Sequence, residues 1–376
     1  MIQRSIQNDL ARVLQQQHKI VILYGARQVG KTTLVQQLLK GLPYRSLYVN
    51  ADLQQYQRAL SSRNLELMKE LIGKNELLFI DEAQNITDIG INLKILHDSL
   101  PELKIIATGS SAFELANQTK EPLTGRTRTF KLYPIAVQEL SEGNTPFELK
   151  ARLEQYMLYG MYPEVLNIQE ENKKIAHLRE LASAYLYKDV LELSGVQHSD
   201  KVYRLLQLLA LQIGSEVSIH ELAKSLGLSQ PTVDRYIDLL EKGFILFRLS
   251  GFSRNLRKEI TKKKKIFFFD LGVRNVLVEN FNPLTARQDV GALWENFLVA
   301  ERIKKIAYDQ LYGRTHFWRT HTGAELDYVE ERNGRLHGYE FKWKPKKRRP
   351  PKAWLETYPQ ATYDTVDQDN FLNFVV

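Results

Sequence analysis

Short apolar runs alternate with amphipathic helical stretches through the first third of the chain. Five of these runs have the length and composition of strands, at residues 20–24, 46–50, 77–80, 104–108 and 129–133. Strands that alternate with helices form parallel sheets, because each parallel pair needs a long crossover connection. The pattern therefore predicts an α/β domain with a five-stranded parallel sheet over residues 1–139.

Beyond this domain the pattern changes to helices and then to a mixture. Leu and Tyr recur at spacings of three and four, which is typical of packed helices. Two further helices flank a tight turn at Gly227-Leu228, the first opened by a capping box from Ser218 to Glu221, and two strand-like runs follow. We expect a helical lid, a winged helix and a further α/β domain, at residues 140–200, 201–275 and 276–376.

A glycine-rich segment joins the first strand-like run to the first long helix. It reads Gly25-Ala26-Arg27-Gln28-Val29-Gly30-Lys31-Thr32, followed by Thr33. This is the spacing of a P-loop, in which backbone N–H groups cradle phosphates, the lysine reaches the terminal phosphates and the Thr hydroxyl binds Mg²⁺. The segment therefore predicts a binding site for ATP or GTP with Mg²⁺.

The third strand-like run ends in two carboxylates, Asp81 and Glu82. Open α/β sheets bind ligands at this end of their strands. We expect Asp81 to hold Mg²⁺ through water and Glu82 to polarise an attacking water, which predicts hydrolysis rather than binding alone. The alternative is a pair of acids that cap the next helix. Thr108 and Ser110 end the fourth run and are candidates to sense the γ-phosphate, although their segment also fits an ordinary strand-to-helix turn.

Arg126 follows Gly125 on the loop before the fifth run. An arginine on such a loop could stabilise the charge of the transition state, in its own subunit or in a neighbouring one. A solvated arginine beside a strand fits the sequence equally well. An oligomer is therefore an open possibility.

The second helix of the predicted winged helix has an apolar stripe facing inward and polar residues facing outward. Outward residues of this helix could read a DNA major groove, and the connection between the two wing strands is rich in lysine. The candidate DNA contacts are Gln230, Thr232, Arg235, Lys263 and Lys264. Packing between domains or contacts in an oligomer would use the same surface.

The last hundred residues contain acids in the order helix Glu, hairpin Asp and strand Glu-x-Lys. Side chains alternate along a strand, so Glu340 and Lys342 emerge on the same face. Asp327 and Glu340 could hold Mg²⁺, with Lys342 positioning or activating water and Glu295 completing the site. Charged residues that alternate on an exposed strand are the simpler interpretation of Glu-x-Lys alone.

These motifs resemble those of a large family of bacterial and archaeal predicted ATPases of the AAA+ superfamily. The likeness extends to Leu123-Thr124-Gly125-Arg126 and to Gly160-Met161-Tyr162-Pro163, where Met161 replaces the second glycine of the family. It implies ATP rather than GTP as the nucleotide. It also implies that the last domain has the core of restriction endonucleases, written PD-(D/E)xK, with or without cleavage activity.

The distribution of charge along the chain indicates which kind of partner it binds rather than how it folds. Residues 244–376 hold 24 Lys and Arg against 16 Asp and Glu, whereas residues 1–243 hold 28 of each, so the net charge of +8 lies in the last third. Basic residues are densest at 262–265 and 344–349, which favours DNA as a partner. The alternative is a switch that binds a protein. Without cysteine or an apolar run of about 20 residues, we expect a cytoplasmic protein that does not enter the membrane.

Overall fold

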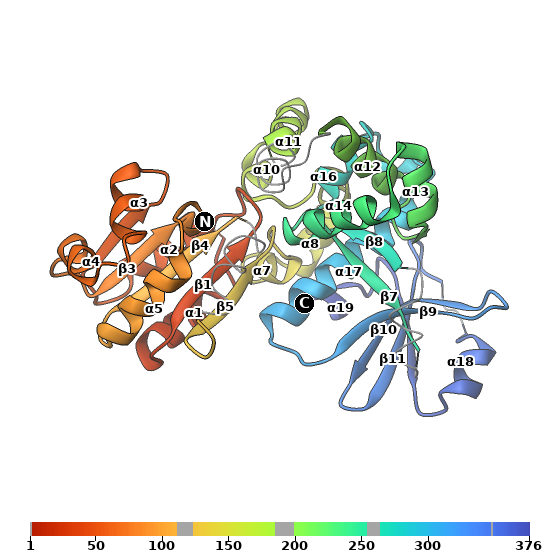
Figure 1. Cartoon of the computed structure of the whole chain (residues 1–376). Coiled ribbons are helices and arrows are strands. Elements are labelled where there is room, and N and C mark those ends of the chain that lie inside the picture. The colour runs from red at the N-terminus through yellow and green to blue at the C-terminus, as the bar shows by residue number, and fades with distance from the viewer. Residues whose placement is uncertain (1, 111–122, 185–198, 254–263, 347–348) are drawn as a thin grey trace. The chain divides into compact units, whose positions relative to one another are not determined.

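The computed structural model describes residues 2–110, 123–184, 199–253, 264–346 and 349–376 (Figure 1). The chain divides into two compact units. The first comprises residues 1–134 with 242–244, and the second comprises residues 135–241 with 245–376. In the part of the chain that is described, no helix is long and apolar enough to cross a membrane.

The first unit contains the five-stranded parallel sheet that the sequence predicted. Its strands are ordered β2-β3-β4-β1-β5, and all four neighbouring pairs are parallel. Strands β1 and β3 are buried along their whole length, as is typical of parallel strands covered on both faces. The strands are β1 (Ile20–Gly25), β2 (Ser46–Asn50), β3 (Leu77–Asp81), β4 (Lys104–Gly109) and β5 (Thr127–Leu132).

Helices of the first unit follow the strands along the chain. Both α1 and α2 pack against β1 and against each other, through buried side chains such as Leu10, Leu14 and Leu34. The helical elements are α1 (Gln7–Gln16), α2 (Lys31–Lys40), α3 (Gln54–Leu60), α4 (Leu65–Ile72), η1 (Ala83–Asn85) and α5 (Ile89–Ser99). Because α2 begins at Lys31, the glycine-rich segment is the connection between β1 and α2.

The second unit begins with short helices in the region predicted as a lid. They are α7 (Val137–Ser141), α8 (Pro146–Ala151), α9 (Leu153–Tyr159), α10 (Pro163–Asn167) and α11 (Glu171–Ala184). The Gly160-Met161 turn packs tightly on a later segment: a Cβ on Gly160 would lie 2.0 Å from Asp270 Oδ1, and the Met161 N–H donates to Asp270 Oδ2 at 2.6 Å. Met161, the departure from the family pattern, is itself buried.

The next elements have the order that a winged helix requires, and their identification with that fold stays a prediction. Strand β6 pairs with β8 and β8 with β7, each antiparallel. Ser218 accepts a hydrogen bond from the Glu221 N–H at the start of α13, and Gly227 ends that helix with a φ of 61°. The elements are α12 (Ser199–Leu211), β6 (Glu216–Val217), α13 (Ile219–Leu226), α14 (Gln230–Lys242), β7 (Leu246–Gly251) and β8 (Lys264–Phe268).

Strands β6 to β8 belong to the same sheet as the strands of the last hundred residues. The sheet is seven-stranded with the order β12-β11-β10-β9-β7-β8-β6, joined by the parallel pair β7 and β9. Its other four strands are β9 (Arg314–Arg319), β10 (Glu325–Arg332), β11 (Arg335–Phe341) and β12 (Thr362–Val366). The boundary that the sequence predicted between residues 275 and 276 therefore falls within one structural unit.

A long buried helix, α17 (Val290–Tyr308), packs against β8, β11 and α19 (Leu372–Val375) (Figure 1). It buries Leu293, Trp294 and Phe297, and Trp294 stacks edge-on against Phe371. A second apolar cluster joins β9 and β10 to α18 (Lys352–Thr357) through Trp318, Leu326 and Trp354. The remaining helical elements are α16 (Leu271–Leu277) and η3 (Leu284–Ala286).

Candidate nucleotide site and a carboxylate cluster

The β1–α2 connection has the shape of a phosphate-binding loop. A Cβ on Gly25 would lie 2.2 Å from the Leu132 carbonyl oxygen, so the strand end requires glycine. Gly30 has a φ of 92° and Gln28 a φ of 58°, both in the left-handed region. These conformations turn the loop back over the start of α2, where N–H groups are oriented toward an anion.

Lys31 and Thr32 lie where the P-loop pattern requires them. The Lys31 side chain is 5% exposed, and its Nζ donates to the Gly25 and Ala26 carbonyl oxygens, each at 2.9 Å. Thr32 Oγ1 donates to Asp81 Oδ2 at 2.7 Å. The metal-binding pair that the sequence proposed is therefore in direct contact. Thr33, also predicted to bind the nucleotide, is exposed in the first turn of α2.

Asp81 is held by hydroxyl groups from three elements. Besides Thr32, it accepts hydrogen bonds from Thr108 Oγ1 at the end of β4 and from Tyr48 OH on β2, the latter at 3.3 Å. Burial and the Asp81 carboxylate raise the pKa of Tyr48. Sequence analysis overlooked Tyr48 because a tyrosine in a strand carries no motif. All three of these donors are hydroxyl groups.

Glu82 is fixed by a residue that the sequence did not single out. Its backbone is left-handed, with a φ of 53°, and its N–H donates to Thr108 Oγ1 at 3.4 Å. Gln84 Nε2 donates to Glu82 Oε2 at 2.6 Å and to Ser110 Oγ at 3.3 Å. Thr108 thus contacts both acids directly, whereas Ser110 reaches Glu82 only through Gln84. Gln84 connects the predicted catalytic glutamate to Ser110.

Arg4 braces the P-loop from the N-terminus. It is 6% exposed, and its guanidinium donates to the Val29 carbonyl at 2.7 Å and to the Tyr133 carbonyl at 2.6 Å. The contact joins residues that lie 25 and 129 positions away in the chain. An isolated arginine in a polar stretch gives no sign of this role in the sequence.

Arg126 lies at the opposite edge of the sheet from the P-loop. Its carbonyl accepts the Ile20 N–H, whereas the P-loop starts beside Leu132, so the length of β1, about 17 Å at 3.3 Å per residue, separates them. The guanidinium binds Asp98, with Nε–Oδ1 at 2.7 Å and Nη2–Oδ2 at 2.9 Å, and these bonds lower the pKa of Asp98 to about 2. The expectation that Arg126 acts on the nucleotide of its own subunit is therefore wrong. Its action on a neighbouring subunit stays a prediction.

The acids of the last hundred residues lie around a lysine that the sequence assigned to a surface run. Lys265 in β8 is 3% exposed, and its Nζ donates to Glu295 Oε1 at 3.0 Å and to Glu325 Oε1 at 2.7 Å. Its inclusion in a solvent-facing basic run was wrong, because the strand directs this side chain toward α17 and β10. We call Lys265, Glu295, Glu325, Asp327, Glu340 and Lys342 the carboxylate cluster.

The outer part of the cluster lies across β10 and β11. Tyr328 pairs with Tyr339, which places Asp327 and Glu340 next to each other on adjacent strands. Asp327 Oδ2 accepts the Phe341 N–H at 2.7 Å, and Lys342 Nζ contacts Glu340 Oε1 at 2.7 Å. The four residues proposed from the sequence are thus brought together in the second unit.

Burial changes the acidity of two members of the cluster. Burial raises the pKa of Glu295 to about 8, against the opposing effect of the Lys265 ammonium. Burial and the neighbouring Glu340 carboxylate raise the pKa of Asp327 to about 6. Among the residues that the structure describes, no three His, Asp or Glu side chains are grouped so that they could hold a metal ion. The cluster therefore does not fit a divalent cation in this arrangement.

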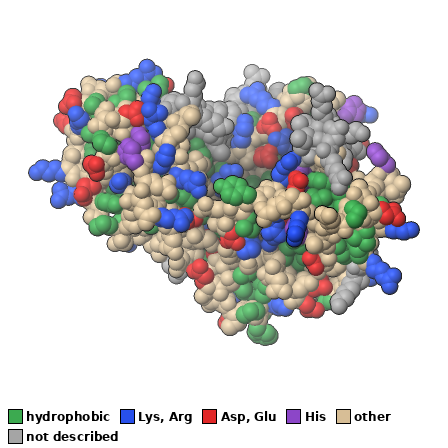
Figure 2. All heavy atoms as spheres, turned by 90° about the horizontal axis from the view of Figure 1, so that it is seen from below, with side chains coloured by type: hydrophobic (Ala, Val, Ile, Leu, Met, Phe, Trp, Pro, Cys, Tyr) green, Lys and Arg blue, Asp and Glu red, His purple; other side chains and the backbone are tan. Residues whose placement is uncertain are grey.

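The predicted DNA-reading helix carries an acidic stripe. Asp234, Asp238 and Glu241 of α14 all contact Arg248 of β7, through Nη1 at 3.2 Å to Asp234 and Nη2 at 2.6 Å to Glu241. One arginine thus faces three carboxylates. Figure 2 shows Lys and Arg interspersed with Asp and Glu on the visible face rather than gathered into one patch.

The candidate DNA contacts differ in their exposure and in the residues that they contact. Gln230 Nε2 lies 3.1 Å from His220 Nδ1, and Thr232 donates its N–H to Ser229 Oγ, so both connect to neighbouring residues of the two helices. Arg235 is exposed on α14. Lys264 is partly buried in β8, and Lys263 lies outside the described residues.

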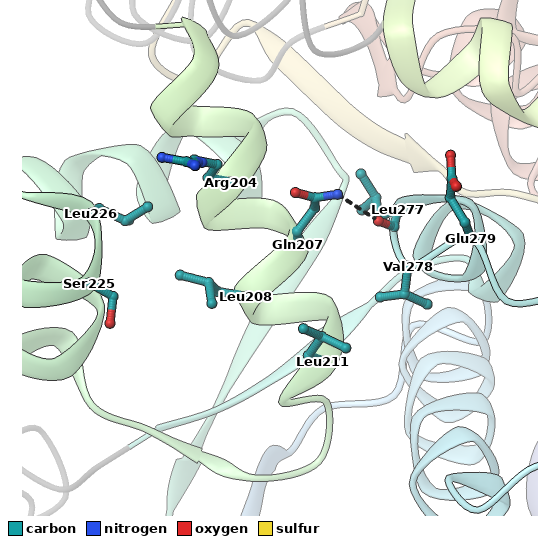
Figure 3. Close-up of a pocket in the computed structure, with 9 residues that line it drawn as sticks. All are labelled: Arg204, Gln207, Leu208, Leu211, Ser225, Leu226, Leu277, Val278 and Glu279. Atoms are coloured by element: carbon teal, nitrogen blue, oxygen red, sulfur yellow. Dashed lines mark hydrogen bonds between the residues drawn. The ribbon is translucent and has the colours of Figure 1, made fainter.

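A groove of about 570 Å³ opens beside α12 in the second unit (Figure 3). Leu208 and Leu211 of α12 face it, Leu226 of α13 borders one side, and Val278 borders the other. Gln207 Nε2 donates to the Leu277 carbonyl at 3.2 Å and fixes α12 to the end of α16. Leu211 is 66% exposed, so the groove is open to solvent rather than an enclosed cavity, and Arg204, Ser225 and Glu279 line it together with the apolar side chains.

Comparison with protein families divides the chain into three segments. Residues 17–141 match the AAA domain family. This match includes the P-loop of residues 25–32 and the five strands of the parallel sheet. Residues 150–284 and 290–365 match two families that are both described as domains of unknown function.

Several relatives and structures are similar to this chain. An uncharacterized protein of Mycobacterium tuberculosis is 27% identical over 326 residues, which cover 86% of this chain and 70% of the relative. An uncharacterized protein of Methanocaldococcus jannaschii is 27% identical, covering 78% of this chain and 68% of the relative. Among solved structures, a Walker-type ATPase of Pyrococcus abyssi is 18% identical with a TM-score of 0.48, covering 74% of this chain and 96% of the ATPase.

Proposed function

We propose that this chain is a Mg²⁺-dependent ATPase. The observation that carries the proposal is the contact of Thr32 Oγ1 with Asp81 Oδ2 at 2.7 Å, with Glu82 beside it and bonded to Gln84. A nucleotide-binding protein without hydrolysis would need Thr32 and Asp81 but not an acid fixed next to them. The fixed Glu82 therefore favours hydrolysis over binding alone.

Each residue has a separate role in the proposed reaction. Lys31 and the N–H groups of the loop bind the phosphates, and Thr32 and Asp81 would hold Mg²⁺ directly and through water. The metal ion, when bound with ATP, neutralises the charge of the phosphates. Glu82 would orient and polarise the attacking water, while Thr108 fixes Asp81 and Gln84, which also bonds Ser110, fixes Glu82.

Two substitutions separate binding from hydrolysis. Glu82→Gln should lower phosphate release by about 100-fold, the usual scale of general-base catalysis, and should leave binding of a fluorescent ATP analogue unchanged. Lys31→Ala should weaken binding itself. Phosphate release by Glu82→Gln at the wild-type rate would contradict the proposal. Competition between ATP and GTP tests the preference for ATP, which rests on the family resemblance.

We further propose that the ATPase acts on DNA through the basic end of the chain rather than through α14. Lys344, Lys346 and Arg349 are exposed after β11 and lie in the third of the chain that carries the excess positive charge. The acidic stripe of α14 would repel phosphates, which weakens the prediction that Gln230, Thr232 and Arg235 read a groove. Lys347 and Arg348 of the same run lie outside the described residues.

The DNA proposal is tested by ATP turnover and by fluorescence anisotropy with duplex and single-stranded DNA. The double variant Lys344→Glu/Lys346→Glu should abolish DNA binding at moderate salt. Lys305→Glu on α17 is the control, because it makes the same change of charge at one site. If neither DNA form binds nor alters turnover, the alternative of a nucleotide-dependent switch for a protein partner is favoured. The acidic stripe supports that alternative, and light scattering with and without nucleotide would detect a change of assembly. Nuclease activity is not part of the proposal, because the carboxylate cluster does not fit a metal ion.

A further inference from the structure

The carboxylate cluster contains its own cation. Lys265 lies in β8, between β7 and β6, where it pairs with Leu249 on one side and Glu216 on the other. Its Nζ lies 5.3 Å from the centre of the Phe317 ring on β9. The Nζ then reaches Glu295 on α17 and Glu325 on β10. One ammonium group therefore links three elements around the acids.

One carboxylate oxygen of each acid in the cluster is engaged by another donor. Glu295 Oε1 and Glu325 Oε1 accept hydrogen bonds from Lys265. Asp327 Oδ2 accepts the Phe341 N–H, and Glu340 Oε1 contacts Lys342. A divalent cation in such a site takes several oxygen ligands at once, which here would have to exchange these donors for the metal.

We propose that the Lys265 ammonium occupies the place of a divalent cation in the carboxylate cluster, so that the cluster fastens β8 to α17 and β10 without a metal. A lysine ammonium is a compact point charge with three donors, which suits it to bridge carboxylates that converge from different elements. The cluster is then closed to metal ions while Lys265 is present, and it becomes a divalent-cation site when the ammonium is removed. The proposal does not depend on ATP hydrolysis.

Removal of the charge at constant length provides the test. Lys265→Met keeps an unbranched apolar side chain of similar length, and Lys305→Met on α17 is the matched control, because it removes another ion-paired lysine of the same unit. Mn²⁺ binding to the full chain without nucleotide is measured by calorimetry and by electron paramagnetic resonance. All four tryptophans lie between residues 294 and 354, so their fluorescence reports the folding of this unit in every variant.

We expect wild type and Lys305→Met to show no Mn²⁺ site that depends on Asp327. Lys265→Met should bind Mn²⁺ at least about tenfold more tightly than wild type, within the range of weak protein sites, and Lys265→Met/Asp327→Asn should lose the gain. Lys265→Arg retains the charge and should behave as wild type.

Two results would overturn the proposal. One is Mn²⁺ binding by wild type that Asp327→Asn or Glu340→Gln abolishes, since the ammonium would then not replace the metal. The other is a folded Lys265→Met that binds no more tightly than wild type. If Lys265→Met does not fold, the comparison of wild type with Asp327→Asn still decides the question.

Discussion

The two units each contain a buried lysine near carboxylates, and the two lysines use their charge differently. Lys31 is 5% exposed and donates to two backbone carbonyls, while the nearby Asp81 is held by hydroxyl groups. Lys265 is 3% exposed and donates to two carboxylates. Lys31 donates to the dipoles of neutral carbonyl groups, which do not neutralise its positive charge. The carboxylates around Lys265 neutralise the charge of that ammonium inside the protein.

This difference separates a site whose lysine could bind an anion from a cluster whose charges are already paired within the protein. Neutral carbonyl groups stabilise an ammonium without cancelling its field, so phosphates can replace them at little cost. A buried ion pair loses several kcal/mol when one partner is removed, because the remaining charge is left without compensation. A lysine beside acids is therefore not by itself a sign of a catalytic site.

The largest effect is expected when a neutral hydrogen-bond donor is removed from the proposed nucleotide site. Gln84→Leu removes the amide that donates to Glu82 Oε2. Because a hydrogen bond to a charged group contributes about 1.5–3 kcal/mol, we expect phosphate release to fall by roughly 10- to 100-fold with nucleotide binding unchanged. Gln57→Leu, which removes a donor to the Ala51 carbonyl, is the control. An equal loss in both variants would mean that Gln84 is only structural.

The second expected effect is a change with pH in the free energy of unfolding of the unit that contains the carboxylate cluster. Glu295 and Asp327 have pKa values raised to about 8 and about 6, so the folded chain holds protons that the unfolded chain releases. Their contribution to stability is present below pH 4 and is lost as the pH rises toward 8. For Asp327 alone the loss is about 2–3 kcal/mol at 1.36 kcal/mol per pKa unit.

Urea unfolding followed by tryptophan fluorescence measures this loss, because every tryptophan lies in the second unit. Glu295→Gln should flatten the profile between pH 6 and 8, whereas Asp327→Asn should only reduce its slope below pH 6, where Glu295 still contributes. A wild-type stability that does not change over this range would show that the cluster keeps its charges, and the contrast between the two lysines would then be smaller than we infer.

The smallest effect is expected at an exposed ion pair, which serves as a reference for the buried ones. Arg126→Ala removes the bond to Asp98 at the edge of the sheet far from the P-loop. Exposed pairs contribute little, so ATP turnover should change by less than about twofold. Turnover is compared at two protein concentrations. A large loss that grows with concentration would instead place Arg126 at the nucleotide of a neighbouring subunit.

The parallel sheet and its ligand-binding edge could be predicted because their signals are local. Each strand is a short apolar run, and the glycine spacing of residues 25–32 fixes the shape of a single loop. The contact of Thr32 with Asp81 follows from the same rules, since Thr32 is in the first turn of α2, which follows the carboxyl end of β1, and Asp81 is the last residue of β3. Gln84 and Tyr48 were overlooked because hydrogen bonds between side chains of different elements leave no periodic pattern.

The P-loop, the acidic pair at the end of β3 and the order of elements could be predicted from the chain alone, because each depends on residues close together in the chain. The distance of Arg126 from the P-loop and the burial of Lys265 among acids became visible only in the folded protein. The pairing of strands β6 to β8 with β9 to β12 in one sheet likewise became visible only there. Such pairings are made between residues tens of positions apart, where burial and charge neutralisation outweigh the local pattern of a basic run.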